Sequence, residues 1–308
     1  MLQSAFTIVA VIFLMIGLGF LMQAKGWFGA NASTVISRVT LRIGMPALVV
    51  SNILGQYSRQ MLLEGAYSLI VPLVVLGGTY LFSAPVARWA HIPKGRIGVF
   101  RALFSFGNTV FLGMPVCLAI FGEGAATVVL FWYLINTTLW WLVGAPNVAK
   151  DGGQAVGSPL KRIASPPLVA CLVSTALVLL GVKLPEIVMT TADYLGRMVT
   201  PLSMLFIGCV LQAMVKRGLK WQKGYGVALA ARFLLGPAIC LPICLLMNLP
   251  PMTLGVFFLQ GGMPSQTQSS LWAQETGADA EYAAGGIALS TLAGLLAIPA
   301  YAWILTLI

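Results

Sequence analysis

Charged side chains are scarce in this sequence. Asp, Glu, Lys and Arg make up 8% of its 308 residues, with 8 acidic residues and a single histidine. A soluble domain of this length would carry about a quarter charged residues. Apolar residues make up 59% of the chain and its mean hydropathy is +0.92. The composition therefore indicates a protein embedded in a lipid bilayer.

The same scarcity argues against several classes of function. A membrane-embedded enzyme would need clustered acids, histidines or a Cys–His pair, and no such cluster is visible, so we expect no enzymatic activity. The chain has no Walker loop, which excludes ATP as its own energy source. Its five cysteines lie in apolar segments without nearby His or acidic partners and predict packing residues rather than a metal site: Cys117, Cys171, Cys209, Cys240 and Cys244.

What the sequence does contain is a series of apolar runs of about 20 residues, the length of a membrane-spanning helix rather than of a barrel strand. We expect an all-α polytopic membrane protein with about ten transmembrane helices. The expected spans are residues 4–22, 34–54, 63–83, 97–121, 125–147, 163–182, 187–211, 224–247, 251–274 and 280–306.

The net charge of +10 does not indicate nucleic acid, because the Lys and Arg residues are spread over short links instead of forming one basic face. They concentrate in the first, third, fifth and seventh links, so the positive-inside rule places both termini on the non-cytoplasmic side of the cell membrane, in bacteria the inner membrane. The ninth link departs from this pattern, since it holds Glu275, Asp279 and Glu281 without Lys or Arg.

An internal repeat divides the chain at its midpoint. At an offset of 155 residues, Arg42-x-x-x-Pro46 overlays Arg197-x-x-x-Pro201, and Gly107 overlays Gly262. We therefore expect a first repeat over residues 1–147, a cytoplasmic linker over 148–162 and a second repeat over 163–308. Five spans per half is an odd number, so the two halves would be inverted, an arrangement typical of secondary transporters with a substrate site near the midplane.

The expected fourth and ninth spans are interrupted by glycine, proline and polar residues at mid-length. Proline removes a helical hydrogen bond and glycine permits open backbone, and such breaks occur at membrane depth only inside protein or beside a watery cavity. Two half-helix N-termini could form an anion site there. The candidate substrate-binding residues are Gly107, Asn108, Thr109, Pro115, Met263, Pro264, Ser265, Gln266 and Thr267. The alternative is ordinary kinks with polar side chains that join helices.

Other polar or proline positions could support such a site. Asn136 in the fifth span is expected to face the cavity. Pro46 and Asn52 in the second span and Pro201 in the seventh mark either hinges or simple kinks, and both interpretations stay open. Arg232 in the eighth span lies deep enough to need a partner or water.

The ten-span layout resembles the auxin efflux carrier family, including bacterial members described as transporters of malonate or other organic anions. The similar motifs are Arg-x-x-x-Pro in the second span, Gly-Asn-Thr-x-x-x-Gly-x-Pro from Gly107 to Pro115, and Met263-Pro264 followed by Gly-Ala-Asp. The resemblance implies that broken helices four and nine cross, that a transport domain moves as an elevator, and that the substrate is a small carboxylate.

The bile acid sodium symporter family has a similar architecture and is the main alternative. Its members carry an acidic residue in the ninth-span break for sodium, where this chain has Ser265, Gln266 and Gln268. No cofactor is expected. The coupling ion, proton or sodium, and a homodimeric state are left open, and the expected partners are the organic anion and the lipid bilayer, without nucleic acid.

Overall fold

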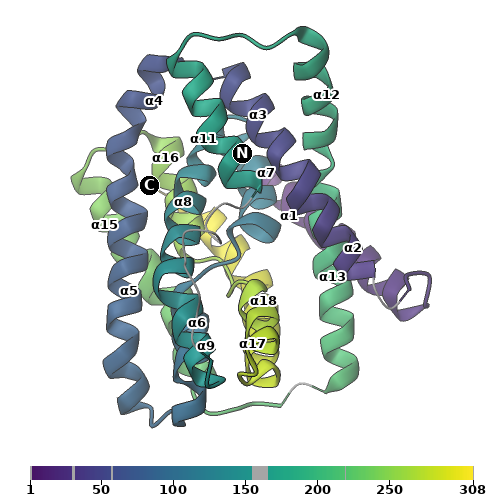
Figure 1. Cartoon of the computed structure of the whole chain (residues 1–308), viewed down its shortest axis with the longest axis vertical. Helices are drawn as coiled ribbons and strands as arrows, with labels where there is room; N and C mark the ends of the chain where they lie inside the picture. Colours follow the sequence, from purple (N-terminus) through teal and green to yellow (C-terminus); the bar gives the residue numbers. More distant parts are fainter. Residues whose placement is uncertain (1, 30–31, 57, 155–165, 219, 308) are drawn as a thin grey trace. The chain divides into compact units, whose positions relative to one another are not determined.

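The computed structural model describes residues 2–29, 32–56, 58–154, 166–218 and 220–307, and their regular secondary structure is helical, apart from one isolated antiparallel bridge. Residues 155–162 of the expected linker lie outside the described residues. The helices, labelled in Figure 1, belong to two compact units. The first comprises Met1–Leu69, Val110–Phe131 and Ala164–Ala213, and the second comprises Ile70–Thr109, Trp132–Ile163 and Met214–Ile308.

The first unit is built from α1 (Leu2–Ala24), α2 (Ala32–Val39), α3 (Met45–Gln56), α4 (Arg59–Gly65), α7 (Met114–Phe121), α11 (Pro166–Leu179), α12 (Glu186–Arg197) and most of α13 (Val199–Arg217). Helix α8 (Ala125–Leu139) begins in it and continues into the second unit. The second unit contains α5 (Ile70–Trp89), α6 (Ile97–Ser105), α9 (Ala145–Asp151), α14 (Tyr225–Ala230), α15 (Gly236–Leu246), α16 (Pro251–Gly261), α17 (Gln268–Thr276) and α18 (Ala280–Ile304).

Five helical segments among the described residues are long and apolar enough to cross a membrane. They are Ala66–Trp89, Ala125–Asp151, Glu186–Ala213, Tyr225–Leu246 and Ala280–Ile304. Three shorter apolar helices are also present, among them Thr109–Phe121. The chain is therefore a multi-pass helical protein, and its arrangement as ten spans in two inverted repeats stays a prediction. The expected spans 97–121 and 251–274 are each divided into two helices, α6 with α7 and α16 with α17.

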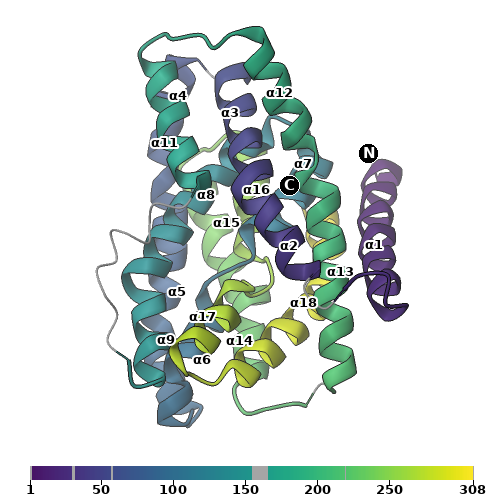
Figure 2. The same ribbon diagram turned by 45° about the vertical axis from the view of Figure 1, so that its right-hand side comes forward.

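In the first unit, α3 lies between α11 and α12 (Figure 2). Helices α1 and α13 approach closely because glycines face the opposite backbone. A Cβ added at Gly19 would lie 2.4 Å from the carbonyl oxygen of Leu205, and one at Gly208 would lie 2.2 Å from that of Ile16. Small residues at such crossings let helices pack without the hydrophobic effect, which is weak within lipid.

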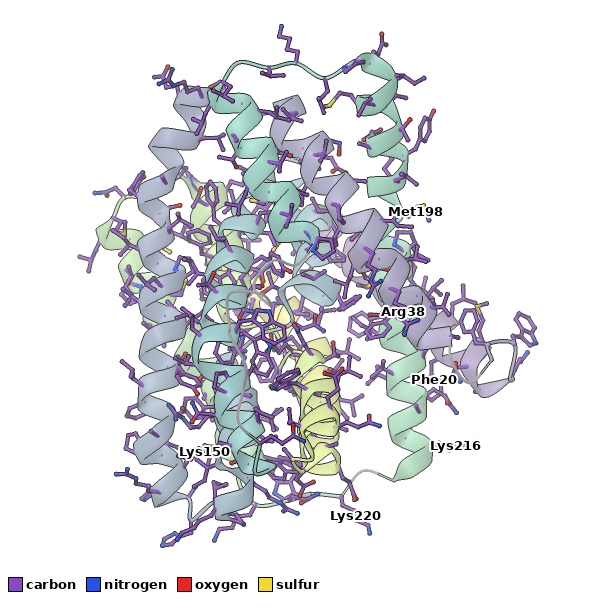
Figure 3. The ribbon with its side chains drawn as sticks, in the orientation of Figure 1. Phe20, Arg38, Lys150, Met198, Lys216 and Lys220 are labelled. Atoms are coloured by element: carbon purple, nitrogen blue, oxygen red, sulfur yellow. The ribbon has the colours of Figure 1, made fainter. Side chains whose placement is uncertain are left out.

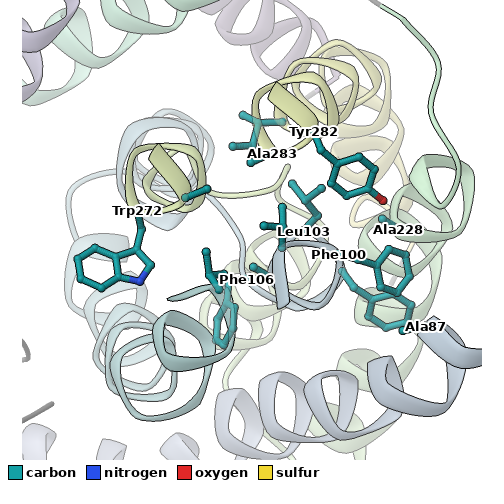
Figure 4. Packing of buried hydrophobic residues seen from close by; sticks show 14 of the residues in the cluster. Ala87, Phe100, Leu103, Phe106, Ala228, Trp272, Tyr282 and Ala283 are labelled. Atoms are coloured by element: carbon teal, nitrogen blue, oxygen red, sulfur yellow. The ribbon is translucent and has the colours of Figure 1, made fainter. Parts of the chain in front are cut away.

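The centre of the second unit is α6, which packs against α5, α9, α14, α17 and α18. Seven of its residues, from Gly98 to Ser105, are buried. Aromatic side chains surround it (Figure 4): the rings of Tyr225 and Tyr282 stack with their centroids 4.9 Å apart, and Phe106 meets Trp140 edge to face at 5.5 Å. The helix that enters the predicted break is thus fixed by packing along most of its length.

A repeated backbone feature precedes four prolines. The π-helical segments Thr40–Gly44, Thr109–Gly113, Trp140–Gly144 and Ala231–Leu235 are each followed by a helix with proline as its second residue. In the last of them, the N–H of Gly236 donates to the carbonyl of Ala231, five residues back. Proline has no N–H, and its ring collides with the carbonyl four residues earlier. The wider π turn accommodates that ring and keeps the helix continuous.

The expected hinge residues all belong to the first unit. Pro46 follows the first of these π turns, whereas Pro201 is the third residue of α13, where its missing N–H costs nothing. Asn52 is buried and its amide donates to the carbonyl of Leu48 within α3 at 3.0 Å. The local contacts do not distinguish a hinge from a kink, and the hinge role stays a prediction.

Pro237 allows a test of how the protein compensates for the missing N–H of a proline within a helix. It leaves the Phe233 carbonyl without a helical N–H, and the Tyr301 hydroxyl donates to that carbonyl at 2.6 Å. We expect Tyr301→Phe to lower the free energy of unfolding by about 1 kcal/mol, measured by denaturation in detergent. In a Pro237→Ala background, the restored backbone N–H can donate to the Phe233 carbonyl, so Tyr301→Phe should lower the free energy of unfolding by less. Tyr194→Phe, at an exposed tyrosine, is the control. An equal loss in both backgrounds would contradict this account.

Candidate functional site

The two predicted breaks meet in the second unit. Helix α6 ends at Ser105 and α16 ends at Gly261. Beyond these ends the backbone is non-helical, and Gly107 forms an isolated antiparallel bridge with Ser265. Segments more than 150 residues apart in the sequence therefore lie directly against each other. We call the segments 106–109 and 262–267 the crossover.

Two backbone hydrogen bonds join the crossover. The N–H of Asn108 donates to the carbonyl of Pro264, with 2.7 Å between nitrogen and oxygen, and the N–H of Gln266 donates to the carbonyl of Phe106 at 3.1 Å. Helix breaks in a buried position leave polar backbone groups that must find partners. Here each broken segment supplies a partner to the other.

Arg232 donates hydrogen bonds to the backbone carbonyls at the ends of the interrupted helices. Its side chain is 2% exposed, and its guanidinium donates to the carbonyl of Ser105 at 2.6 Å and to that of Met263 at 2.9 and 2.8 Å. A longer bond of 3.4 Å reaches the carbonyl of Gly261. Ser105 and Gly261 are the last residues of α6 and α16, where the helix dipole is negative, and Met263 lies two residues beyond α16. A guanidinium can serve them together because its donors are spread in a fork.

The expected partner of Arg232 is therefore backbone rather than an acidic side chain. No ion pair with Arg232 occurs among the described residues. Gly107 fits this arrangement, since a Cβ there would lie 2.5 Å from Nη2 of Arg232. The sequence offered one signal of this role, a deep arginine in a chain that has broken helices and no acid at mid-span.

Several predicted site residues hold the crossover together. The Ser265 hydroxyl donates to the carbonyl of Leu103 at 2.7 Å, and its N–H donates to the hydroxyl of Ser290 at 3.1 Å. The Pro264 ring lies against Gly294, where an added Cβ would be 2.3 Å from the proline Cγ. Ser265 and Pro264 are thus engaged by the protein itself, which makes them positioning residues.

Other polar atoms at the crossover remain unengaged. The Asn136 amide of α8 donates to Oε1 of Gln266 at 3.4 Å. Within the described part of the chain, Asn136 Oδ1, Gln266 Nε2, Thr109 Oγ1 and Ser269 Oγ are buried and have no hydrogen-bond partner. An unpaired buried polar atom costs about 1–3 kcal/mol. Water or a polar ligand would supply hydrogen-bond partners to these atoms.

The remaining predicted residues fall in different places. Asn108 is buried at the crossover, and Met263 supplies a carbonyl to Arg232. Thr267 precedes the first residue of α17, which places a helix N-terminus directly after Gln266. Pro115 lies in α7 and belongs to the first unit, and its part in substrate binding stays a prediction.

A family model described as "Membrane transport protein" matches residues 4–156 and 154–302, nearly the whole chain. The chain belongs to the membrane transport protein family. This family includes the auxin efflux carriers, so the resemblance noted in the sequence holds at the level of the family.

Relatives of this membrane transport protein extend over its full length. An uncharacterized transporter of Methanocaldococcus jannaschii is 26% identical over 307 residues, which cover 97% of this chain and 98% of the relative. An uncharacterized transporter of Methanothermobacter thermautotrophicus is 24% identical over 307 residues, with 98% of each chain covered. Both are similar to this chain over nearly its whole length, and neither is named for a substrate.

The role of Arg232 in this membrane transport protein can be tested by substitution. Arg232→Leu leaves three buried carbonyls without a donor, so we expect a loss of more than about 3 kcal/mol of unfolding free energy. Arg232→Lys keeps the charge without the fork and should give a smaller loss. The measurement is thermal denaturation of the purified protein in detergent.

The matched control for this test is Arg197→Gln. Arg197 pairs with Asp193 at 2.9 Å, but their side chains are 72% and 49% exposed. An exposed pair of this kind is worth about 0.5 kcal/mol. Stability of Arg232→Leu equal to that of Arg197→Gln would show that the crossover does not depend on the guanidinium.

Proposed function

We propose that this membrane transport protein is a secondary transporter that moves a small organic anion, such as a mono- or dicarboxylate. The observation that carries the proposal is the group of unengaged buried polar atoms at the crossover. Three of the four, Gln266 Nε2, Thr109 Oγ1 and Ser269 Oγ, are hydrogen-bond donors. A carboxylate offers only acceptors, so it complements them.

The charge of Arg232 favours an anion over a cation. Its guanidinium is bound to backbone carbonyls, which satisfy its hydrogen bonds but do not neutralise its full charge. No carboxylate pairs with it in the described residues. A positive charge in a low-dielectric region attracts a negative ligand and repels a positive one. The N-terminus of α17 adds a partial positive charge beside Gln266.

Elevator-type alternating access, which the resemblance to auxin efflux carriers implies, is part of this proposal. It requires that all substrate-binding groups move as one body. The crossover, Asn136 and Arg232 belong to the second unit, whereas Pro46 and Pro201 belong to the first. We assign the second unit as the transport domain and the first as the scaffold.

Uptake into proteoliposomes tests the function. Labelled mono- and dicarboxylates are presented to reconstituted protein with no gradient, with a sodium gradient and with a proton gradient. We expect saturable uptake of at least one carboxylate, because the donor set is complementary to that group, and competition by unlabelled anion. The gradient that accelerates uptake identifies the coupling ion. Absence of saturable flux for every anion, with protein that is folded in the same vesicles, would refute the proposal.

Substitutions at the crossover test the site. Asn108→Ala, Asn136→Ala and Gln266→Ala should each raise the apparent KM for the anion about fivefold to tenfold, the effect of losing one hydrogen bond. Gln266→Glu has nearly the same shape and should raise the apparent KM further, because its carboxylate repels the anionic substrate. Thr291→Ala is the control, since its hydroxyl bonds only within α18, to Ile287 at 2.8 Å. Wild-type KM in the three alanine variants would show that these amides only join helices.

A further inference from the structure

An apolar groove of about 720 Å³ runs along the second unit, and none of its lining residues belongs to the crossover. Helix α5 forms one wall, including Phe82 and Trp89, and the segment from Val227 in α14 to Ala238 in α15 forms the other. Phe104 of α6 contributes to the lining between them. Every residue that lines the groove is apolar or aromatic, so a soluble anion would find no charged partner in it.

The length of the groove matches one leaflet of a bilayer. At 1.5 Å per helical residue, the wall from Phe82 to Trp89 extends about 10 Å and the wall from Val227 to Ala238 about 16 Å. Half of a bilayer's hydrocarbon core is about 15 Å. Both walls belong to segments apolar and long enough to cross a membrane. The groove can therefore receive an acyl chain along its length.

One end of the groove lies beside two basic loops. Trp89 is the last residue of α5, 74% exposed, in the position of an interfacial tryptophan. The loops that follow α5 and precede α14 are joined there. Ile92 packs against Gly224, where an added Cβ would lie 2.5 Å from Ile92 Cδ1, and Arg96 donates to the side chain of Gln222 at 2.8 Å.

Four cations, Arg88, Lys94, Lys220 and Lys223, are exposed at this end, and none of them forms an ion pair with a described residue. Figure 3 shows Lys220 at the lower extremity of the chain, in the loop before α14. Asp279 is engaged by Arg96 at 2.7 Å, and Glu281 is the other acid at the start of α18. The charge at the end of the groove is therefore predominantly positive.

We propose that this groove binds an anionic phospholipid, with an acyl chain between α5 and α14–α15 and the head-group phosphate against the basic loops. The apolar walls, about as long as one leaflet is deep, suit an acyl chain. The basic end suits an anionic head group, the other part of the same phospholipid. Lys and Arg beside a membrane surface select anionic over zwitterionic head groups. The site is separate from the crossover, so it does not depend on the proposed substrate.

Native mass spectrometry of the delipidated full-length protein tests the head-group preference. Phosphatidylglycerol and phosphatidylcholine with identical chains are added in equal amounts. We expect about tenfold more phosphatidylglycerol bound, and we expect Lys220→Gln with Lys223→Gln to reduce this preference to near equality. Lys25→Gln with Lys183→Gln removes the same charge from exposed sites in the first unit and should leave the preference intact. Equal binding of both lipids by the wild-type protein would overturn the proposal.

A groove-filling variant tests the acyl chain. Ala238 is an exposed residue of the groove wall, so Ala238→Trp places a large ring in the groove. Its folding is checked by the thermal unfolding midpoint, and Leu246→Trp, at a site 82% exposed and outside the groove, is the matched control. Loss of bound lipid in Ala238→Trp alone supports the proposal. Unchanged lipid binding, or a lipid-free dimer that only Ala238→Trp dissociates, would overturn it.

Discussion

The last carbonyls of α6 and α16 have no helical partner, and they are buried where water cannot serve them. The guanidinium of Arg232 donates hydrogen bonds to carbonyls at the ends of both helices. The backbone N–H groups of Asn108 and Gln266 join the two non-helical segments that follow. The rest of the second unit follows from this constraint. Gly107 must lack a side chain, because a Cβ would collide with Arg232. Pro264 packs on α18, Ser265 bonds to α18 and α6, and aromatic side chains pack around α6.

The sequence predicted the two breaks well because glycine and proline act on the backbone itself. Gly107 and Gly262 lie within two residues of the ends of α6 and α16. The polar residues chosen for the site include Gln266 and Asn136, each of which has one buried side-chain atom without a hydrogen-bond partner among the described residues. The role of Arg232 was not predictable in the same way. Its acceptors are backbone carbonyls, which every residue possesses, so no pattern of side chains identifies which ones it meets.

The internal repeat shows a second limit of sequence reasoning. Pro46 and Pro201, 155 residues apart, were expected to occupy equivalent positions of a repeat, yet Pro46 follows a π turn while Pro201 lies at the start of a separate helix. Proline excludes one hydrogen bond in both places, and packing decides how the backbone accommodates that exclusion. The π turns before Pro46, Pro115, Pro146 and Pro237 were therefore beyond prediction, although each proline was visible.

The pairing of Arg232 with carbonyls rather than with a carboxylate has an electrical consequence. Under the proposed mechanism, the buried crossover has the positive charge of Arg232 beside it when it is empty, and a bound monovalent anion offsets that charge. The loaded unit would then move no net charge across the membrane in its buried site. The empty unit would move the charge of Arg232, and a charge that crosses the whole field gains or loses about 2.3 kcal/mol per 100 mV. Membrane voltage would thus affect the return of the empty unit and have little effect on the step that carries the anion.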